Sequence, residues 1–391
     1  MMPEGWEQFT LGEFMDFKNG LNTDKSQYGS GIKFVNVMDV FGNDFLTQEI
    51  IVGRVQVPEK KLQENLLQYG DILLNRTSET FDEIAMSSTY LDSAPATFGG
   101  FVIRGRDRKN KLLPNFSVYA FQSSLFRQQV IRLGQGAVRA NIGQKDLSKV
   151  ILPVPPKAEQ KKIAQILSTW DKAITTTEQL LANSQQQKKA LMQQLLTGQK
   201  RLLGENGVRF SGEWKHGLLK DIANVAKGKA LSSKNLIEGD YPVIAGGKIS
   251  PYTHNDFTHE YSITVSASGA YAGYVSFHPY KFWASDCSVV RAKSSANTLF
   301  IYQLLSYLQD KIYSLQSGGA QPHIYPKDLQ TLKISYPCLA EQEAIASALT
   351  QVDSYIKLSQ RKTEHLKAEK KALMQQLLTG KRRVKVDEDA A

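Results

Sequence analysis

The eleven residues KKALMQQLLTG occur twice in this chain, at Lys188–Gly198 and again at Lys370–Gly380. The repeat extends backwards without a gap, so that residues 158–198 align with residues 340–380 at an offset of 182 positions. In this alignment 19 of the 41 paired residues are identical. Each repeat follows a longer stretch that differs between the two halves, and two copies are too few for a solenoid. We therefore expect a pseudo-two-fold symmetric molecule.

The repeated segments have the hydrophobic spacing of coiled-coil helices. In each segment, seven of ten positions spaced alternately by four and three residues are apolar, which forms a heptad seam. The apolar seam residues are Ile163, Leu167, Trp170, Ile174, Leu181, Leu191, Leu195, Ile345, Leu349, Val352, Ile356, Leu366, Leu373 and Leu377. Prolines precede both segments, and Gly198 and Gly380 follow as candidate C-caps. A helix of about 40 residues is ~60 Å long, and we expect the two to pack antiparallel with one domain at each end.

The two variable stretches contain short apolar runs punctuated by Gly, Pro and Asn, which predict strand-rich domains. The expected fold class is α+β, with two mixed α/β domains separated by the two long antiparallel helices. The predicted boundaries are residues 1–157 for the first domain, 158–198 for the first helix, 199–213 for a linker, 214–339 for the second domain, 340–380 for the second helix and 381–391 for a charged tail.

The charge of the chain favours a polyanionic partner. Its 391 residues include 48 Lys and Arg and 38 Asp and Glu, for a formal net charge of +10. This charge is unevenly distributed along the chain. Residues 1–103 carry 7 basic and 15 acidic side chains, whereas residues 104–157 carry 11 basic and 2 acidic side chains. The two cysteines, Cys287 and Cys338, are too few for a disulfide scaffold. The N-terminal residues are not those of a signal peptide, no apolar run is long enough to span a membrane, and the expected location is the cytoplasm.

Catalytic and metal-binding motifs are missing from the sequence. Gly246-Gly247-Lys248 is followed by Ile249 and lacks the Ser or Thr of a phosphate-binding loop. Gly134-Gln135-Gly136 lacks the third glycine of a dinucleotide fingerprint. The Asp/Asn-Pro-Pro-aromatic tetrad of base methyltransferases does not occur, and the six histidines have no metal-binding spacing. We therefore expect no catalysis by this chain alone.

The candidate DNA contacts are centred on two glycine-containing loops, residues 134–145 and 317–327, which end the variable stretches. Glycines allow close approach to phosphates, and Arg, Asn and Gln side chains pair with base edges. In the first domain the candidates are Lys18, Asn19, Arg76, Arg104, Arg106, Gln135, Arg139, Asn141 and Gln144. In the second domain they are Lys227, Lys229, Lys248, Ser268, Tyr271, Lys281, Gln321, His323 and Lys327. For each single residue, an ordinary surface or turn role is an equally good interpretation.

The order of these segments resembles the specificity subunits of type I restriction–modification systems. In each half a variable domain, a glycine loop, Lys-Asp-Leu, a strand and a proline precede the pattern A-E-Q-x-x-I-A-x-x-L-x-x-x-D-x-x-I. The matching residues are Ala158, Glu159, Gln160, Ile163, Ala164, Leu167, Asp171 and Ile174, and then Ala340, Glu341, Gln342, Ile345, Ala346, Leu349, Asp353 and Ile356. The resemblance covers nearly the whole chain.

The resemblance implies that each domain reads one half of a bipartite asymmetric site in double-stranded DNA, and that the helices set the spacer between the half-sites. It implies that the helices dock two methylation subunits, and that restriction subunits complete the complex. It implies a non-catalytic subunit without a cofactor of its own, whose partners use S-adenosylmethionine, ATP and Mg²⁺. Because recognition domains of the family diverge strongly, no base-contacting residue is carried over.

Two alternatives stay open at this point. The chain can be a structural coiled-coil adaptor that joins other proteins without binding DNA, or a self-sufficient DNA-modifying enzyme. Electrophoretic mobility with DNA pools, with and without methylation subunits, separates the three.

Overall fold

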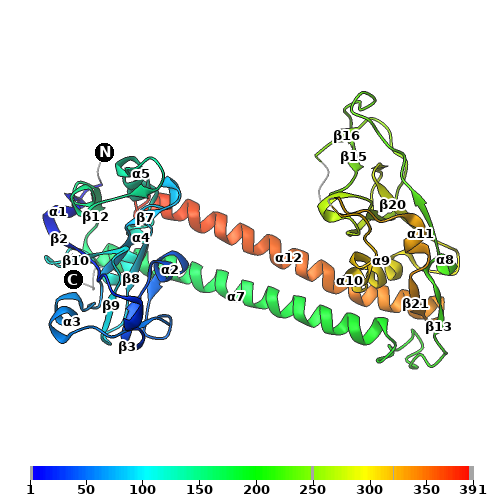
Figure 1. Ribbon diagram of the computed structural model, residues 1–391, viewed down its shortest axis with the longest axis horizontal. Coiled ribbons are helices and arrows are strands. Elements are labelled where there is room, and N and C mark those ends of the chain that lie inside the picture. Colours follow the sequence, from blue (N-terminus) through cyan, green and yellow to red (C-terminus); the bar gives the residue numbers. More distant parts are fainter. Residues whose placement is uncertain (1–2, 248–250, 320, 387–391) are drawn as a thin grey trace. The chain divides into compact units, whose positions relative to one another are not determined.

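The chain divides into two compact units, and the computed structural model describes each of them. The described residues are 3–247, 251–319 and 321–386. The first unit consists of Met1–Thr176 and Thr363–Ala391, and the second of Thr177–Lys362. The long helices α7 (Lys157–Leu196) and α12 (Leu339–Leu377) each contribute residues to both units (Figure 1). Each unit therefore joins one β-rich domain to a part of each long helix, and the expected α+β class is confirmed.

Both long helices begin one residue before the predicted starts and end two or three residues before the predicted ends. Gly198 and Gly380 have φ angles of +74° and +70°, the left-handed conformation that ends a helix at low cost in glycine. A Cβ atom at Gly380 would lie 2.2 Å from Pro3 Cγ, and one at Gly198 would lie 3.2 Å from the Trp214 ring. The last residue of the repeat thus closes the helix against the start of a domain.

The first domain is built on a five-stranded sheet in the order β2-β10-β6-β8-β4, accompanied by sheets β5-β3-β9, β1-β12 and β11-β7. Its strands are β1 (Glu7–Thr10), β2 (Met15–Asn19), β3 (Tyr28–Val35), β4 (Phe45–Leu46), β5 (Arg54–Val55), β6 (Ile72–Asn75), β7 (Thr77–Ser78), β8 (Ser87–Tyr90), β9 (Ala96–Phe98), β10 (Val102–Asp107), β11 (Ala140–Asn141) and β12 (Ile151–Val154). Its short helices are α1 (Leu11–Phe14), η1 (Lys25–Gln27), α2 (Val37–Gly42), α3 (Glu59–Asn65), η2 (Phe81–Glu83), α4 (Pro114–Ala120), α5 (Ser124–Leu133) and α6 (Gln144–Leu147).

The five-stranded sheet buries both of its faces. Strand β6 shows this, because Ile72 and Leu74 belong to one apolar cluster and Leu73 belongs to another. The first of these clusters also contains Ile163 and Leu377, one residue from each long helix. The core of the first domain therefore continues directly into the helices that end there.

The second domain has a four-stranded antiparallel sheet in the order β14-β20-β17-β18, with sheets β16-β15-β19 and β13-β21 beside it. Its strands are β13 (Lys215–Leu218), β14 (Ala223–Lys227), β15 (Tyr241–Ile244), β16 (Thr253–His254), β17 (Ser262–Ser266), β18 (Val275–His278), β19 (Trp283–Ala284), β20 (Cys287–Ala292) and β21 (Lys333–Tyr336). Its short helices are α8 (Leu219–Ile222), η3 (Gly269–Tyr271), α9 (Thr298–Tyr307), α10 (Gln309–Tyr313) and α11 (Pro326–Gln330). Its main core cluster includes Leu195, Ile345 and Leu349 of the long helices.

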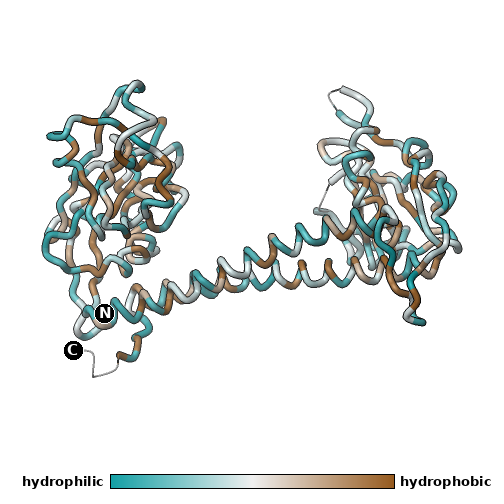
Figure 2. Tube along the Cα trace, turned by 90° about the horizontal axis from the view of Figure 1, so that it is seen from below, coloured by the Kyte–Doolittle hydropathy of each residue, from teal (hydrophilic) through white to brown (hydrophobic). Residues whose placement is uncertain are grey.

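Apolar and polar residues alternate along both long helices (Figure 2). The buried seam residues are Ile163, Leu167, Ile174, Leu195, Ile345, Leu349 and Leu377. The partly exposed seam residues are Trp170, Leu181, Leu191, Val352, Ile356, Leu366 and Leu373. Thr177, Ser359 and Thr363 are buried at the polar middle of the seam. Burial is thus greatest where the helices enter the domain cores, because there they contact sheets as well as each other.

Candidate nucleic-acid interface

Loop 134–145 of the first domain is closed by a short antiparallel bridge. The backbone N–H of Gln135 donates to Asn141 O at 2.8 Å, and the N–H of Asn141 donates to Gln135 O at 2.7 Å. Gly136 has a φ angle of +123°, and a Cβ there would lie 2.1 Å from Arg139 O. The bridge and the glycine fold residues 136–139 into a tight, exposed tip that carries Arg139.

Two further candidates of the first domain, Asn19 and Arg76, are connected to this loop. Strand β11 of the loop pairs with β7, and Ile142 N–H donates to Arg76 O at 3.0 Å. The Gln144 carboxamide, oriented to satisfy both of its groups, accepts from the Asn19 N–H at 3.1 Å and donates to Phe17 O at 3.0 Å. Asn19 and Arg76 are therefore brought beside Asn141 and Gln144 of the loop. Within the described residues, the side chains of Arg76 and Arg139 form no hydrogen bond or ion pair, so both are free to meet a ligand.

The other basic candidates of the first domain are engaged within the domain. Lys18 Nζ donates to Glu64 O at 2.7 Å. Arg104 is 7% exposed, packs over the Phe98 ring, and has its pKa lowered by burial. Arg106 Nε and Nη2 donate to the two carboxylate oxygens of Asp71, each at 2.7 Å. The geometry therefore gives no support to a DNA contact by Arg104 or Arg106. Both arginines instead make contacts within the domain.

Loop 317–327 of the second domain has the same frame as loop 134–145. Ser317 N–H donates to His323 O at 2.9 Å, and His323 N–H donates to Ser317 O at 2.8 Å. Ser317, Gly318 and His323 lie 182 positions after Gln135, Gly136 and Asn141, respectively. Gly318 has a φ angle of +94°. Ile324 N–H donates to Ala267 O at 2.9 Å, as Ile142 does to Arg76 O. The two domains thus present different side chains on one backbone frame.

The remaining candidates of the second domain differ in whether they contact this frame. The His323 ring stacks on exposed Tyr325 with centroids 6.2 Å apart, and Lys327 Nζ lies 5.5 Å from that ring. The Ser268 hydroxyl donates to the Asp286 carboxylate, and β-bridge pairing joins Ser268 to His323. The exposed side chains of Lys227, Lys229, Tyr271, Lys281 and Gln321 complete the set. Lys248 lies outside the described residues.

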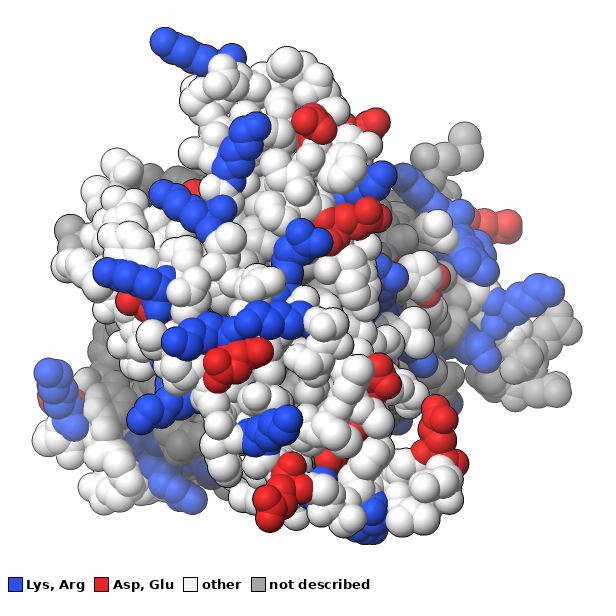
Figure 3. Space-filling model, turned by 90° about the vertical axis from the view of Figure 1, so that its right-hand side faces the viewer, with Lys and Arg blue, Asp and Glu red and all other residues white. Residues whose placement is uncertain are grey.

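Basic side chains are spread over one face of the second unit, with acidic ones among them (Figure 3). Lys229 Nζ lies 5.1 Å from the Trp283 ring centroid, and Lys281 Nζ lies 4.6 Å from that of Phe257. Aromatic rings therefore hold two of the predicted cations in place. An interface that combines such cations with polar loops suits the phosphate contacts and base-edge contacts of DNA.

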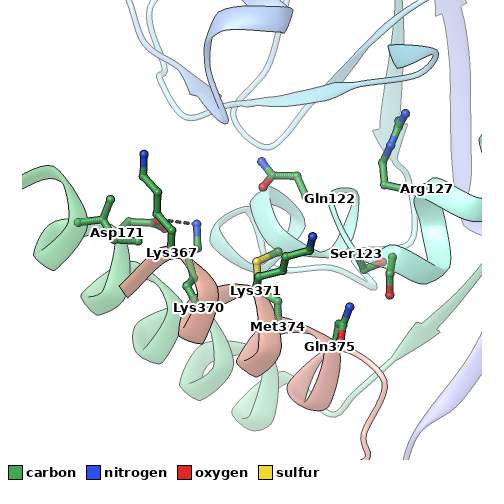
Figure 4. A pocket seen from close by; sticks show the side chains of 11 residues that line it. Gln122, Ser123, Arg127, Asp171, Lys367, Lys370, Lys371, Met374 and Gln375 are labelled. Carbon is green, nitrogen blue, oxygen red and sulfur yellow. Dashed lines mark hydrogen bonds and ion pairs between the residues drawn. The ribbon is translucent and has the colours of Figure 1, made fainter. Parts of the chain in front are cut away.

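In each unit an aspartate joins a domain to both long helices. In the first unit, Tyr119 OH donates to Asp171 Oδ2 at 2.7 Å, and Lys370 forms an ion pair with Asp171 (Figure 4). We call this contact the first clasp. It borders a cavity of about 430 Å³ that Gln122, Lys367 and Lys371 also line. Burial and the Asp171 carboxylate raise the pKa of Tyr119 far above its ordinary value.

The second clasp repeats this contact in the second unit. Gln303 Nε2 donates to Asp353 Oδ2 at 2.6 Å, and Lys188 Nζ lies 2.5 Å from Asp353 Oδ1. Asp353 and Lys370 lie 182 positions after Asp171 and Lys188. The pairing of Lys188 and Lys370 with aspartates accounts for two cations at seam positions, where a buried unpaired charge would be costly.

The sequence interpretation missed two residues of the candidate interface, Phe101 and Asp286. Phe101 follows Gly99 and Gly100 in the turn between β9 and β10, and Asp286 lies in the turn between β19 and β20. The glycine pair before Phe101 was the available signal, since such pairs mark turns.

The described residues contain no group of three His, Cys, Asp or Glu side chains placed to hold a metal ion. Within the same residues, no helix has the length and apolar character needed to cross a membrane.

Comparison with known proteins points to one family. The model of the type I restriction modification DNA specificity domain matches residues 3–183 and 211–368. The type I restriction enzyme MjaVIII specificity subunit of Methanocaldococcus jannaschii is 23% identical over 98% of this chain and 94% of its own length. The EcoKI specificity subunit of Escherichia coli is 25% identical over 45% of this chain and 38% of its own.

Solved structures show a similar fold. The S subunit of a type I restriction–modification system from M. genitalium has a TM-score of 0.65 at 17% identity, over 95% of this chain and 96% of that one. The HsdS subunit from Thermoanaerobacter tengcongensis has a TM-score of 0.50 at 19% identity, over 97% and 98%.

Proposed function

The chain belongs to the specificity (S) subunits of type I restriction–modification systems, the non-catalytic component of these complexes, and from this we propose that its two domains read the two halves of a bipartite asymmetric DNA site. Loops 134–145 and 317–327, with the residues beside them, would enter the grooves. Asn19, Arg76, Arg139, Asn141 and Gln144 would contact one half-site. Gln321, His323 and Lys327 would contact the other.

The observation that carries this proposal is the shared frame of the two loops. The same bridge, the same left-handed glycine and the same following isoleucine occur in both domains. The side chains on the frame differ, with Asn141 replaced by His323 and Arg139 by Gln321 at the same offset. A common frame with different donors and acceptors supports two reading sites of one kind that select different base sequences.

We propose further that the long helices set the spacer between the half-sites and dock two methylation subunits. Helices α7 and α12 each pass without interruption from one unit into the other, which suits a rigid spacer. Leu180, Tyr355 and Leu358 expose apolar surface on the part of the helices that belongs to the second unit, as expected where protein partners bind. Restriction subunits would complete the complex in the cytoplasm, and S-adenosylmethionine, ATP and Mg²⁺ would bind to the partner subunits.

The test is selection from a random pool of duplex DNA by the chain together with its methylation subunits, at a stated salt concentration. We expect an enriched motif with two different half-sites separated by a fixed gap. Enrichment of no motif would favour the structural adaptor, and methylation or cleavage of DNA by the purified chain alone would favour the self-sufficient enzyme.

A further inference from the structure

Phe101 presents an aromatic ring to solvent beside the candidate interface. Phe101 is 65% exposed, whereas Phe98, three positions earlier, is fully buried. Covering a phenylalanine is favourable in water, so a ring left outside the core is available to a ligand. The position of this ring, and not its exposure alone, carries the inference.

The turn of residues 98–102, which we call the pinned turn, is held from both sides. Arg76 N–H donates to Phe101 O at 2.8 Å, and Val102 N–H donates to Gly99 O at 2.9 Å. A Cβ at Gly20 would lie 2.2 Å from Gly99 O, and one at Gly100 would lie 2.1 Å from Asn22 Oδ1. The backbone of the pinned turn is therefore held in place by close contacts on both sides.

The pinned turn borders the polar residues of the first loop. Arg76, whose N–H donates to Phe101 O, also accepts through its own carbonyl from Ile142 of the loop. On the other side, Ile103 of β10 pairs with Asn19 of β2. An apolar ring beside Arg and Asn donors matches the major-groove edge of an A·T pair, which presents hydrogen-bonding groups and the thymine methyl.

The second domain has a related turn, shorter by one residue, at residues 284–287. Gly228 N–H donates to Cys287 O and Lys229 N–H to Ala284 O, as Gly20 does to Val102 O and Leu21 to Phe98 O. Ala267 N–H donates to Asp286 O, so that Asp286 occupies the place of Phe101. Carboxylates accept hydrogen bonds from cytosine N4. Equivalent backbone hydrogen bonds therefore carry different side chains in the two domains, although the turn of the second domain is one residue shorter.

We propose that the pinned turn is a base-reading element and that Phe101 contacts the 5-methyl group of a thymine in the major groove of the first half-site. This inference rests on the proposed function, and it adds a specificity-determining residue from a third segment of the domain. The contact is apolar and adds to the hydrogen bonds that Arg76 and Asn19 offer.

The test uses the complex with its methylation subunits and duplexes in which single thymines of the selected site are replaced by deoxyuridine, which lacks the 5-methyl group. We expect one replacement in the first half-site to weaken binding by the unmodified chain about fourfold, the factor for one buried methyl. Phe101→Ala should bind the thymine and deoxyuridine duplexes equally, and Phe101→Leu should keep part of the difference. Phe45→Ala, which removes another exposed phenylalanine of this unit, should behave as the unmodified chain.

Thermal unfolding of each variant confirms that the fold is intact. The inference is overturned if the first half-site contains no thymine, or if Phe101→Ala keeps the same discrimination as the unmodified chain. Loss of the methylation subunits from Phe101→Ala on size exclusion, with discrimination unchanged, would show that the ring contacts protein instead. Failure of the unmodified complex to select any bipartite site would contradict the proposed function, on which this inference rests, whereas a selected site whose thymines do not depend on Phe101 would contradict this inference alone.

Discussion

Arg139 occupies the exposed tip of loop 134–145, where its guanidinium has no hydrogen-bond or ion-pair partner among the described residues, and it is the first candidate for direct reading of a base. We expect Arg139→Ala to weaken binding by about 1–3 kcal/mol for sites that contain the correct first half-site, and to relax specificity at one position. Competition binding against single-base variants of each half-site measures this. Uniform weakening across all sequences, with a lower salt slope, would instead identify a phosphate contact.

The pairing of Arg201 with Glu341 is a buried ion pair of the second unit. Glu341 is fully buried, and Arg201 Nε and Nη2 donate to its two carboxylate oxygens at 2.5 Å. Arg201→Met would leave a buried carboxylate without its partner, and we expect a loss of about 3–5 kcal/mol in the free energy of unfolding. Denaturant titration checks this, with Arg361→Met on the exposed side of α12 as the control. Equal effects of both substitutions would contradict the assignment.

His278 links the stability of the second domain to pH. Burial lowers its pKa from 6.5 to about 4, and its Nε2 lies 2.8 Å from Thr264 Oγ1. Because the unfolded chain binds a proton more readily, the stability from this residue is complete above pH 6.5 and is lost as the pH falls towards 4. The loss amounts to at most about 3 kcal/mol. His278→Gln should flatten this dependence in unfolding measurements between pH 4 and 7. If the stability of the variant depended on pH as steeply as that of the unmodified chain, the assignment to His278 would be wrong.

At the scale of elements, the two clasps fix each domain on its helices. Asp171→Lys should place two cations together and release Tyr119, lowering the unfolding midpoint of the first unit. The double exchange of Asp171→Lys with Lys370→Asp should restore part of the lost stability. It regains the ion pair but not the hydrogen bond from Tyr119. A double-mutant cycle measures the coupling.

The corresponding exchange of Asp353 and Lys188 is the matched control for the second unit. It should leave the first unit unaffected, because the described contacts of each clasp lie within one unit. No coupling between Asp171 and Lys370 would show that their contact adds no net stability.

At the scale of the whole molecule, the helices determine the distance between half-sites if they act as the spacer. Insertion of one heptad between Thr175 and Gln187, matched by one at the equivalent residues 357–369, keeps the seam in phase and adds ~10 Å of helix. We expect the selected DNA gap to lengthen by up to about three base pairs, with both half-sites unchanged. Methylation-protection assays over a series of gap lengths measure this. An unchanged gap would remove the spacer role.

The heptad spacing and the repeat predicted both long helices to within three residues, because these signals are local and occur twice. The same repeat predicted the equivalence of the two glycine loops. Charge and residue type, in contrast, did not separate Arg139 from Arg104. Arg139 lies on an exposed loop tip, whereas Arg104 is buried against Phe98, and this difference arises from strand pairing between residues far apart in the chain.

The sequence by itself determined the duplicated plan, the two helices and the family, since the periodicity and the repeated motifs are written in the order of the residues. Only the tertiary structure decided which polar side chains are free and which are used internally. It brought Asn19 and Arg76 to the first loop, and it placed Phe101 and Asp286 at related turns. These juxtapositions depend on antiparallel pairing over long separations, where no local pattern specifies the partner.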